Sequence, residues 1–320
     1  MTLALPAAAA SLLAGIGRTP LVELDVLADV VPGARAFGKL ESCNPGGSIK
    51  DRPVARMMLG ALRRGALSGG KRLLDSSSGN AGIAYAMLGA ALEVPITLVV
   101  PGNASAERLA RIRAHGAELV LTDPLEGYDF AIAQARRLAS EHPGRYVHSD
   151  QYGNDDNWRA HHATTGVEIL EQVAAATAGG VPDVFVCGVG TGGSLTGIGR
   201  RLREVNPDVV IVAIVPELFP GIEGLKPLGH EGDFVPPILD ASLIDVRVEV
   251  RTEDALAATL ALARRGLFVG PSSGGSVHAL RQVAAEALAR RRRGVRAPIA
   301  VTLLNDTGER YASTGMWDAT

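Results

Sequence analysis

The segment from Asp183 to Ser194 reads DVFVCGVGTGGS, an apolar run that leads into four closely spaced glycines. The apolar run Asp183–Gly188 predicts a buried strand, and the apolar periodicity after the last glycine predicts a helix. Glycines at such a junction let the backbone approach an anion closely, and the N–H groups that begin a helix attract phosphate. The segment therefore predicts a phosphate site in a protein of the α/β class.

The alternation of short strands with helices continues along the chain from about residue 50. The expected strands are Arg72–Asp75, Ile96–Val100, Glu118–Thr122, Asp183–Gly188, Val209–Val215, Val246–Val250 and Ile299–Leu304. The expected helices are Gly82–Leu92, Ala104–His115, Tyr128–Glu141, Asn157–Ala174, Gly193–Val205, Glu253–Arg265 and Ser273–Arg293. This order favours a mostly parallel sheet covered by helices.

The chain has 320 residues, a length that favours two lobes or one large α/β unit. Hydrophobic residues make up 47% and charged residues 21%, the balance of a soluble globular enzyme. With 32 basic and 34 acidic side chains the formal net charge is −2, so we expect no nucleic-acid partner and no anionic membrane partner. No apolar run reaches the ~18 residues that span a bilayer.

Cysteine usage and the first residues bear on the compartment. Cys43 and Cys187 lack the C-x-x-C spacing of redox or zinc motifs, so we expect no metal and a reducing, cytoplasmic location. The opening MTLALPAAAASLLAG has no basic residue ahead of its apolar stretch, which is not typical of a signal peptide. We expect it to form a surface arm or a helix.

The segment KLESCNPGGSIKDRP runs from Lys39 to Pro53. In it, a glycine turn places Lys50 at the start of a predicted helix. Burial and the positive end of a helix favour the neutral form of a lysine amine, which can form an imine and transfer a proton. Lys50 is therefore a candidate catalytic residue. Read alone, the segment fits a solvated surface lysine as well.

Two further segments place hydroxyl groups at a strand-to-helix junction. The segment SSSGNAG, from Ser76 to Gly82, follows the expected strand Arg72–Asp75 and could hold a carboxylate through its hydroxyl and N–H groups. A serine N-cap would account for one of these hydroxyls, but not for three hydroxyls and an asparagine. The segment GPSSGG, from Gly270 to Gly275, fits either another such site or a simple N-cap.

The glycine segment also permits a different class of enzyme. Gly188, Gly190 and Gly193 satisfy the G-x-G-x-x-G pattern of dinucleotide-binding folds, and Glu217 could bind the ribose. A nicotinamide-dependent dehydrogenase is therefore an alternative. It leaves the lysine and serine segments without a role.

Taken in order, these segments resemble the cysteine synthase family, the β-family or fold type II of pyridoxal-phosphate enzymes. The resemblance extends from GRTPLV, which begins at Gly17, to GERYAST, which ends at Thr314. It implies an α/β fold with two open, mostly parallel sheets flanked by helices. It also implies a large cofactor-binding domain of residues 1–39 plus 151–320 and a small mobile domain of residues 40–150.

The resemblance assigns roles to individual residues. Lys50 would carry pyridoxal 5'-phosphate as a Schiff base, Asn80 would contact its ring oxygen and Ser272 would hydrogen-bond its pyridine nitrogen. The cofactor phosphate would be bound by Gly190, Thr191, Gly192, Gly193 and Ser194. The substrate would be bound by Ser77, Ser78, Gly79, Gln151, Gly224 and Lys226. The last of these lies where phosphoserine-using relatives place a cation.

The implied reaction is a β-replacement on an activated L-serine, O-acetylserine or O-phosphoserine, through an α-aminoacrylate. Sulfide is the expected nucleophile, as in a cysteine synthase, and the family's usual assembly is a homodimer. Ala81 stands where these enzymes commonly carry a threonine, and Asn157-Trp158 departs from their usual proline-containing segment. An amino-acid nucleophile such as glutamate, used to make diaminopropionate precursors, is therefore the alternative.

Overall fold

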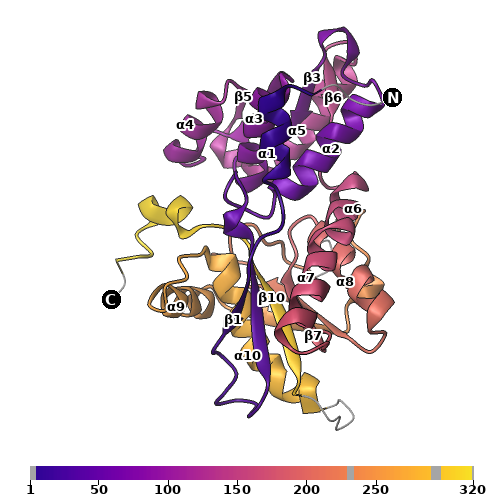
Figure 1. The fold of residues 1–320 in the computed structure, drawn as a ribbon. Helices are drawn as coiled ribbons and strands as arrows, with labels where there is room; N and C mark the ends of the chain where they lie inside the picture. The colour runs from indigo at the N-terminus through magenta and orange to yellow at the C-terminus, as the bar shows by residue number, and fades with distance from the viewer. Residues whose placement is uncertain (1–4, 229–233, 290–296, 319–320) are drawn as a thin grey trace. The chain divides into compact units, whose positions relative to one another are not determined.

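The computed structural model describes residues 5–228, 234–289 and 297–318. The chain divides into two compact units (Figure 1). Unit 1 consists of Met1–Ile16 and Asn44–Asn157, and unit 2 consists of Gly17–Cys43 and Trp158–Thr320. Unit 1 thus combines a segment near the start of the chain with its middle part. Each unit has its own mostly parallel sheet with helices, so the expected fold class is confirmed.

The sheet of unit 1 has four parallel strands in the order β5-β4-β3-β6. The strands are β3 (Arg72–Asp75), β4 (Ile96–Pro101), β5 (Glu118–Thr122) and β6 (Tyr146–His148). The helices are α1 (Ala7–Ala14), α2 (Asp51–Arg63), α3 (Asn80–Leu92), α4 (Ala106–Ala114) and α5 (Gly127–Glu141). Every residue of β4 is buried, as expected for a central parallel strand that is covered on both faces.

The sheet of unit 2 has six strands in the order β1-β2-β10-β7-β8-β9, and only the β1-β2 pair is antiparallel. The strands are β1 (Leu21–Leu24), β2 (Arg35–Leu40), β7 (Val184–Gly188), β8 (Val210–Pro216), β9 (Val246–Val250) and β10 (Ile299–Leu304). The helices are α6 (Asp156–Ala163), which starts at the end of unit 1, α7 (Thr165–Ala176), α8 (Gly193–Val205), α9 (Thr252–Ala263) and α10 (Pro271–Ala289). In Figure 1 the indigo strands come from the start of the chain and the yellow β10 from near its end, and β2 pairs directly with β10.

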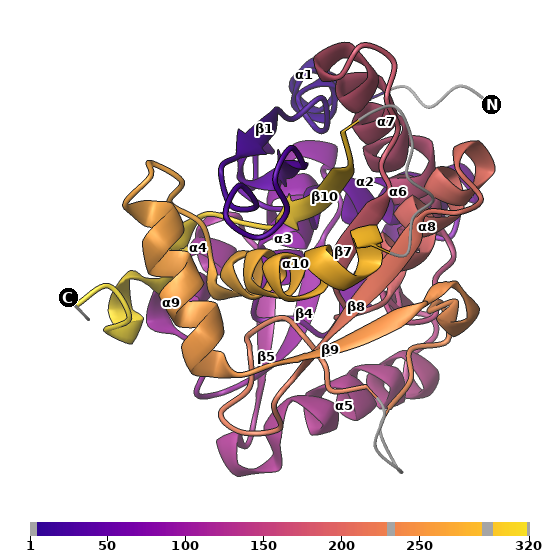
Figure 2. The same ribbon diagram turned by 90° about the horizontal axis from the view of Figure 1, so that it is seen from below.

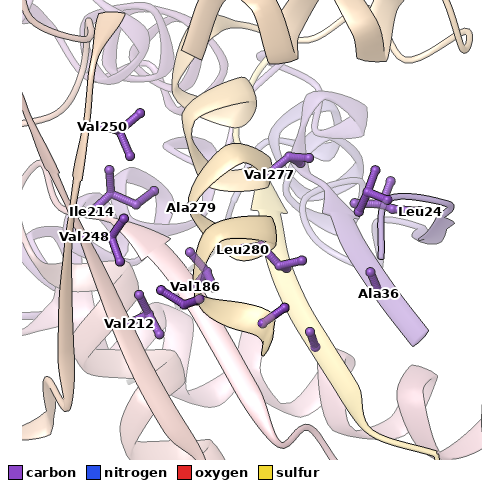
Figure 3. Close-up of a cluster of buried hydrophobic side chains, with 14 of the residues drawn as sticks. Leu24, Ala36, Val186, Val212, Ile214, Val248, Val250, Val277, Ala279 and Leu280 are labelled. Atoms are coloured by element: carbon purple, nitrogen blue, oxygen red, sulfur yellow. The ribbon is translucent and has the colours of Figure 1, made fainter. Parts of the chain in front are cut away.

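Helices cover both faces of the unit 2 sheet. On one face α10 lies along the strands (Figure 2), and its Leu280 joins Val186 and Val212 in a buried apolar cluster (Figure 3). Successive side chains of a strand point to opposite faces, so Ile211 points away from this cluster. Gly199 of α8 faces Ile211, which places α8 on the opposite face. The carboxyl ends of β7 and β8 therefore open between two helical layers, where α/β proteins bind ligands.

The seven expected strands are all present, with ends that differ by one residue in β4, β7 and β8. Strands β1, β2 and β6 are not apparent from the sequence pattern, because they are short or carry charged side chains. The start of the chain forms α1, in agreement with the expected arm or helix.

The helix expected over Asn157–Ala174 is interrupted, and this expectation was wrong. Thr164 has φ −127° and ψ −71°, outside the helical region, and its hydroxyl donates to the Ala160 carbonyl oxygen at 2.8 Å. The helix expected over Ser273–Arg293 begins at Pro271, and its end beyond Ala289 lies outside the described residues. Within the described part of the chain, no helix is long and apolar enough to cross a membrane.

Candidate active site

Lys50 immediately precedes α2, at the end of a tight glycine turn. Gly47 has a φ of 82°, a left-handed conformation that glycine adopts without strain. A Cβ on Gly46 would lie 2.2 Å from Oδ1 of the buried Asp51, so only glycine fits there. The Gly46 N–H donates to Asp51 Oδ2. Asp51 is the first residue of α2, so this bond ties the turn to the helix and fixes the backbone position of Lys50.

The serine loop, Ser76–Gly79, joins the end of β3 to the start of α3. Ser77 is buried, and the next three residues are half-buried. A Cβ on Gly82 would lie 2.0 Å from the Ser77 carbonyl oxygen, so glycine lets the loop lie against the first turn of α3. No heavy atom of the described residues lies within 4 Å of a Cβ built on Gly79. The loop therefore leaves room for a ligand on that side.

Asp75, the last residue of β3, is a buried carboxylate at the base of the serine loop. It accepts hydrogen bonds from the Ser76 N–H at 2.7 Å, the Tyr85 hydroxyl at 2.7 Å and the Gln151 N–H at 3.2 Å. Burial raises the pKa of Asp75, against the opposing effects of His148 and of these hydrogen bonds. The carboxylate thus joins β3, α3 and the segment after β6 at one point.

The backbone of the serine loop is also held by side chains from distant parts of unit 1. The Tyr128 hydroxyl and Gln151 Nε2 donate to the Ser76 carbonyl oxygen at 2.7 Å and 3.0 Å. Tyr128 also hydrogen-bonds with Tyr152, and burial raises the pKa of Tyr128 to about 12. The sequence carries no local signal for Tyr128, which lies 52 positions from Ser76. Gln151, which we expected to contact the substrate, contacts the loop backbone here.

The glycine loop, formed by Gly190, Thr191, Gly192, Gly193 and Ser194, leads from β7 into α8. Gly192 has a φ of 85°, and a Cβ there would lie 2.7 Å from Leu239 Cβ. Glycine is therefore required by both backbone conformation and space. The Gly193 N–H donates to Thr191 Oγ1 at 3.4 Å. The first N–H groups of α8, with the hydroxyls of Thr191 and Ser194, are the donor set that a phosphate dianion requires.

The segment that carries Gly224 and Lys226 lies beside the glycine loop within unit 2. The Lys226 N–H donates to the Val189 carbonyl oxygen at 2.8 Å, and Leu225 packs against the end of β7. Gly224 is exposed and has a φ of 84°. The Lys226 ammonium lies 5.4 Å from the ring centroid of Phe234, a cation–π contact. The backbone contact therefore brings Lys226 to the strand end that carries the candidate phosphate site.

Ser272 lies in the first turn of α10 and is only 6% exposed. Its Oγ accepts a hydrogen bond from Asn305 Nδ2 at 3.2 Å. A serine hydroxyl is neutral and can donate to an unprotonated pyridine nitrogen. It cannot hold that nitrogen protonated as a carboxylate would.

Glu217, the ribose-binding candidate of the dehydrogenase alternative, serves a different purpose. Its Oε1 accepts a hydrogen bond from the N–H of Thr252, the first residue of α9, at 2.5 Å. This bond to Thr252 lowers the pKa of Glu217. The carboxylate therefore stabilises the N-terminus of a helix.

The candidate residues divide between the two units. Unit 1 contains Lys50, Ser77, Ser78, Gly79, Asn80 and Gln151. Unit 2 contains Gly190, Thr191, Gly192, Gly193, Ser194, Gly224, Lys226 and Ser272. Their chemistry fits pyridoxal phosphate, with an amine for the aldehyde, a glycine-lined helix start for the phosphate and a neutral hydroxyl for the ring nitrogen. The described residues hold no group of three or more His, Cys, Asp or Glu side chains placed to bind a metal ion.

Comparison with known proteins decides the family. A profile of the family described as pyridoxal-phosphate dependent enzyme matches residues 12–296. The chain belongs to this family. The cysteine synthase of Aquifex aeolicus is 44% identical over 306 residues, which cover 94% of this chain and 90% of that protein.

Two solved structures are also similar to this chain over nearly its whole length. A cysteine synthase from Entamoeba histolytica has a TM-score of 0.85 and 31% identity, and the match covers 100% of this chain and 94% of that one. O-ureido-L-serine synthase has a TM-score of 0.84 and 36% identity, with coverages of 97% and 95%. The expected resemblance to the cysteine synthase family is thus confirmed.

Membership fixes the class of chemistry. The chain is a pyridoxal-phosphate-dependent enzyme of the β-substituting type, as the resemblance to the cysteine synthase family implied. The dehydrogenase alternative is wrong. Its G-x-G-x-x-G pattern arises because any glycine-lined strand-to-helix junction can satisfy that spacing.

Proposed function

We propose that this protein is a cysteine synthase, which replaces the β-substituent of an activated L-serine with sulfide. The observation that carries the proposal is the serine loop at the start of α3, in the same unit as the turn that presents Lys50. The loop offers hydroxyl and N–H donors for an amino-acid carboxylate, and the turn offers an amine. Similarity to proteins named cysteine synthase supports this choice of reaction.

In this proposal each part of the site has one task. Lys50 Nζ would hold the cofactor through its aldehyde until the substrate amine takes its place there, and the freed Lys50 amine would then take the α-proton of the substrate. The bound cofactor supplies an electron sink for the bond changes at the substrate's α- and β-carbons. Asn80 would hold its ring oxygen and Ser272 its ring nitrogen. The phosphate is bound by Gly190, Thr191, Gly192, Gly193 and Ser194.

The remaining residues would select the substrate. Ser77, Ser78 and Gly79 bind its carboxylate, with Gln151 and Gly224 completing the pocket. Lys226 would favour O-phosphoserine over O-acetylserine as donor, because its cation belongs to the segment beside the glycine loop. Sulfide is small and requires no anchoring groups. Glutamate as nucleophile, the alternative, would require polar contacts for two carboxylates.

An assay of donor and acceptor tests this proposal. The purified protein, loaded with pyridoxal phosphate, is given O-acetylserine or O-phosphoserine, each with sulfide, thiosulfate or glutamate. Product masses identify the reaction, and the expected product with sulfide is cysteine. A protein that forms product with glutamate but not with sulfide would support the alternative. The order of the two donors tests the role of Lys226.

We also propose the organisation that the resemblance implies. The large cofactor-binding domain would be residues 1–39 plus 151–320, and the small mobile domain residues 40–150. The protein would act in the cytoplasm as a homodimer. Light scattering at several protein concentrations would test the dimer. Localisation of a tagged chain would test the compartment.

A further inference from the structure

The end of β10 meets the first turn of α10 in unit 2. Asn305, the residue after β10, donates its Nδ2 to Ser272 Oγ at 3.2 Å, and its backbone N–H donates to Ser273 Oγ at 2.9 Å. Ser273 is fully buried and Ser272 nearly so. Two adjacent serines of α10 are thus both acceptors of hydrogen bonds from one asparagine.

The segment that carries Asn305 is fixed on its other side as well. The Gly270 N–H donates to the Asp306 carbonyl oxygen at 3.3 Å, and the Tyr311 hydroxyl donates to Asp306 Oδ2 at 2.9 Å. Val269 and Thr307 form a β-bridge. Asn305 therefore occupies a defined position relative to the start of α10.

The direction of the bond between Asn305 and Ser272 has a chemical consequence. An amide nitrogen only donates, so Ser272 Oγ is the acceptor in this bond. Among the described residues, Asn305 is the one side chain bonded to that hydroxyl. The single hydrogen of the Ser272 hydroxyl is then available to a different acceptor. A pyridine nitrogen without a proton is such an acceptor.

We propose that Asn305 is a positioning residue that fixes the Ser272 hydroxyl as a hydrogen-bond donor to the cofactor ring. This inference rests on the proposed contact between Ser272 and the ring nitrogen. In this role Asn305 acts through Ser272, to which its Nδ2 donates. Its effect is to favour binding of the unprotonated ring, because a donor hydroxyl has no lone pair directed at a ring N–H.

Cofactor binding by the apoprotein tests this role. We would measure dissociation constants for pyridoxal phosphate and for a carbocyclic analogue in which C–H replaces the ring nitrogen. The dissociation constant of the analogue divided by that of pyridoxal phosphate reports recognition of the nitrogen alone. Asn305→Leu, which keeps the volume but removes the amide, should reduce this ratio about two- to tenfold, the value of one neutral hydrogen bond. In a Ser272→Ala background the same substitution should change nothing.

Asn305→Asp supplies an independent readout, because an ionised carboxylate only accepts hydrogen bonds. The Ser272 hydroxyl should then donate to residue 305 and present a lone pair to the ring, which must bring its own proton. Affinity for pyridoxal phosphate should therefore rise as pH falls, more steeply than in the wild type. Identical pH profiles for the two proteins would overturn the inference.

The set of variants separates the inference from the function beneath it. A Ser272→Ala variant with the wild-type ratio would refute the contact between Ser272 and the ring. A reduced ratio in Ser272→Ala, together with a wild-type ratio in Asn305→Leu, would refute the role of Asn305 alone. Asn206→Leu is the matched control, since Asn206 Nδ2 donates to the Pro182 carbonyl oxygen at 2.8 Å at the far end of β7. That control should keep the wild-type ratio.

Discussion

The serine loop of unit 1 and the glycine loop of unit 2 both join a parallel strand to a helix. In the serine loop, the Ser76 N–H donates to Asp75, and Tyr128 and Gln151 donate to the Ser76 carbonyl oxygen. The pKa of the Asp75 carboxyl is raised. The glycine loop is held by backbone conformation and by the close approach of Leu239. Two loops with the same place in the topology are therefore stabilised in different ways. The serine loop depends on hydrogen bonds and on the protonation of Asp75, and the glycine loop depends on its backbone conformation and close packing.

The largest effect should come from Lys50, which belongs to neither loop. Lys50→Ala should leave both loops intact and reduce turnover by at least the ~10²–10⁴-fold that a positioned proton-transfer group contributes. Steady-state assays with sulfide would measure the loss, and circular dichroism would check the fold. Turnover at the wild-type rate would show that Lys50 is misassigned.

Gly192→Ala tests the dependence of the glycine loop on shape. A Cβ on this left-handed backbone should lower the free energy of unfolding by about 1–2 kcal/mol. The close contact of that Cβ with Leu239 should add to the loss. Affinity for pyridoxal phosphate should fall as well. Gly266→Ala is the matched control, because Gly266 has a φ of 84° and no described atom within 4 Å of its Cβ position. It should lose stability but keep cofactor affinity, as measured by urea unfolding and titration.

Asp75→Asn tests the dependence of the serine loop on protonation. The pKa of Asp75 is higher in the folded protein than the usual value, so the folded state binds this proton more tightly. Its contribution to stability is fully present below the unfolded pKa of about 3.9 and is lost as pH rises through the folded pKa. The variant has no titrating group at this position, so its stability does not fall with pH for this reason. The difference in unfolding free energy, variant minus wild type, should therefore increase with pH in urea titrations. A constant difference would contradict the assignment.

Tyr128→Phe should have a smaller effect, confined to the serine loop. Loss of the hydrogen bond to the Ser76 carbonyl oxygen should raise KM for the activated serine about two- to tenfold. Affinity for pyridoxal phosphate should not change, because the glycine loop has no part in this bond. Tyr146→Phe, at a buried tyrosine of β6, is the control and should leave KM unchanged. Equal effects of the two variants would show that the hydroxyl of Tyr128 does not position the loop.

On the reaction with O-acetylserine, Lys226→Ala is expected to have the smallest effect of these variants, because Lys226 concerns the phosphate of the other donor alone. A charge-assisted contact to a phosphate is worth about 1.5–3 kcal/mol, so kcat/KM for O-phosphoserine should fall about ten- to a hundredfold. The value for O-acetylserine should hardly change, which makes this variant the mildest on that donor. If kcat/KM for O-phosphoserine divided by kcat/KM for O-acetylserine is the same in wild type and variant, Lys226 does not contact the donor phosphate.

The sequence predicted those parts of the fold and site that short segments encode. Strand-to-helix junctions with glycines and hydroxyls identified the candidate loops around Asn80 and Gly192, because phosphate and carboxylate sites need those residues within a few positions. The contacts that support the loops come from far away. Tyr128 lies 52 positions from Ser76, and Asn305 lies 33 positions from Ser272. No spacing rule connects such pairs.

Strand β2 illustrates a second limit. Its Lys39 is fully buried, which a pattern of apolar residues does not predict. The charge is accommodated because Lys39 Nζ lies 2.7 Å from Glu168 Oε2 and 2.8 Å from Gln172 Oε1, both on α7. Those partners lie more than 120 positions away in the sequence. A buried lysine in a strand can be recognised only when the fold supplies its partner.

The pairing of β2 with β10 has a consequence for synthesis on the ribosome. The two strands align Arg35 with Ile299, so β2 emerges long before the neighbour that completes its side of the sheet. Residues 44–157, which contain every strand of unit 1, are translated in between. The sheet of unit 2 therefore cannot close until β10 has left the exit tunnel. Until then the edge of β2 that will face β10 is unpaired, and the nascent protein must be protected from aggregation there.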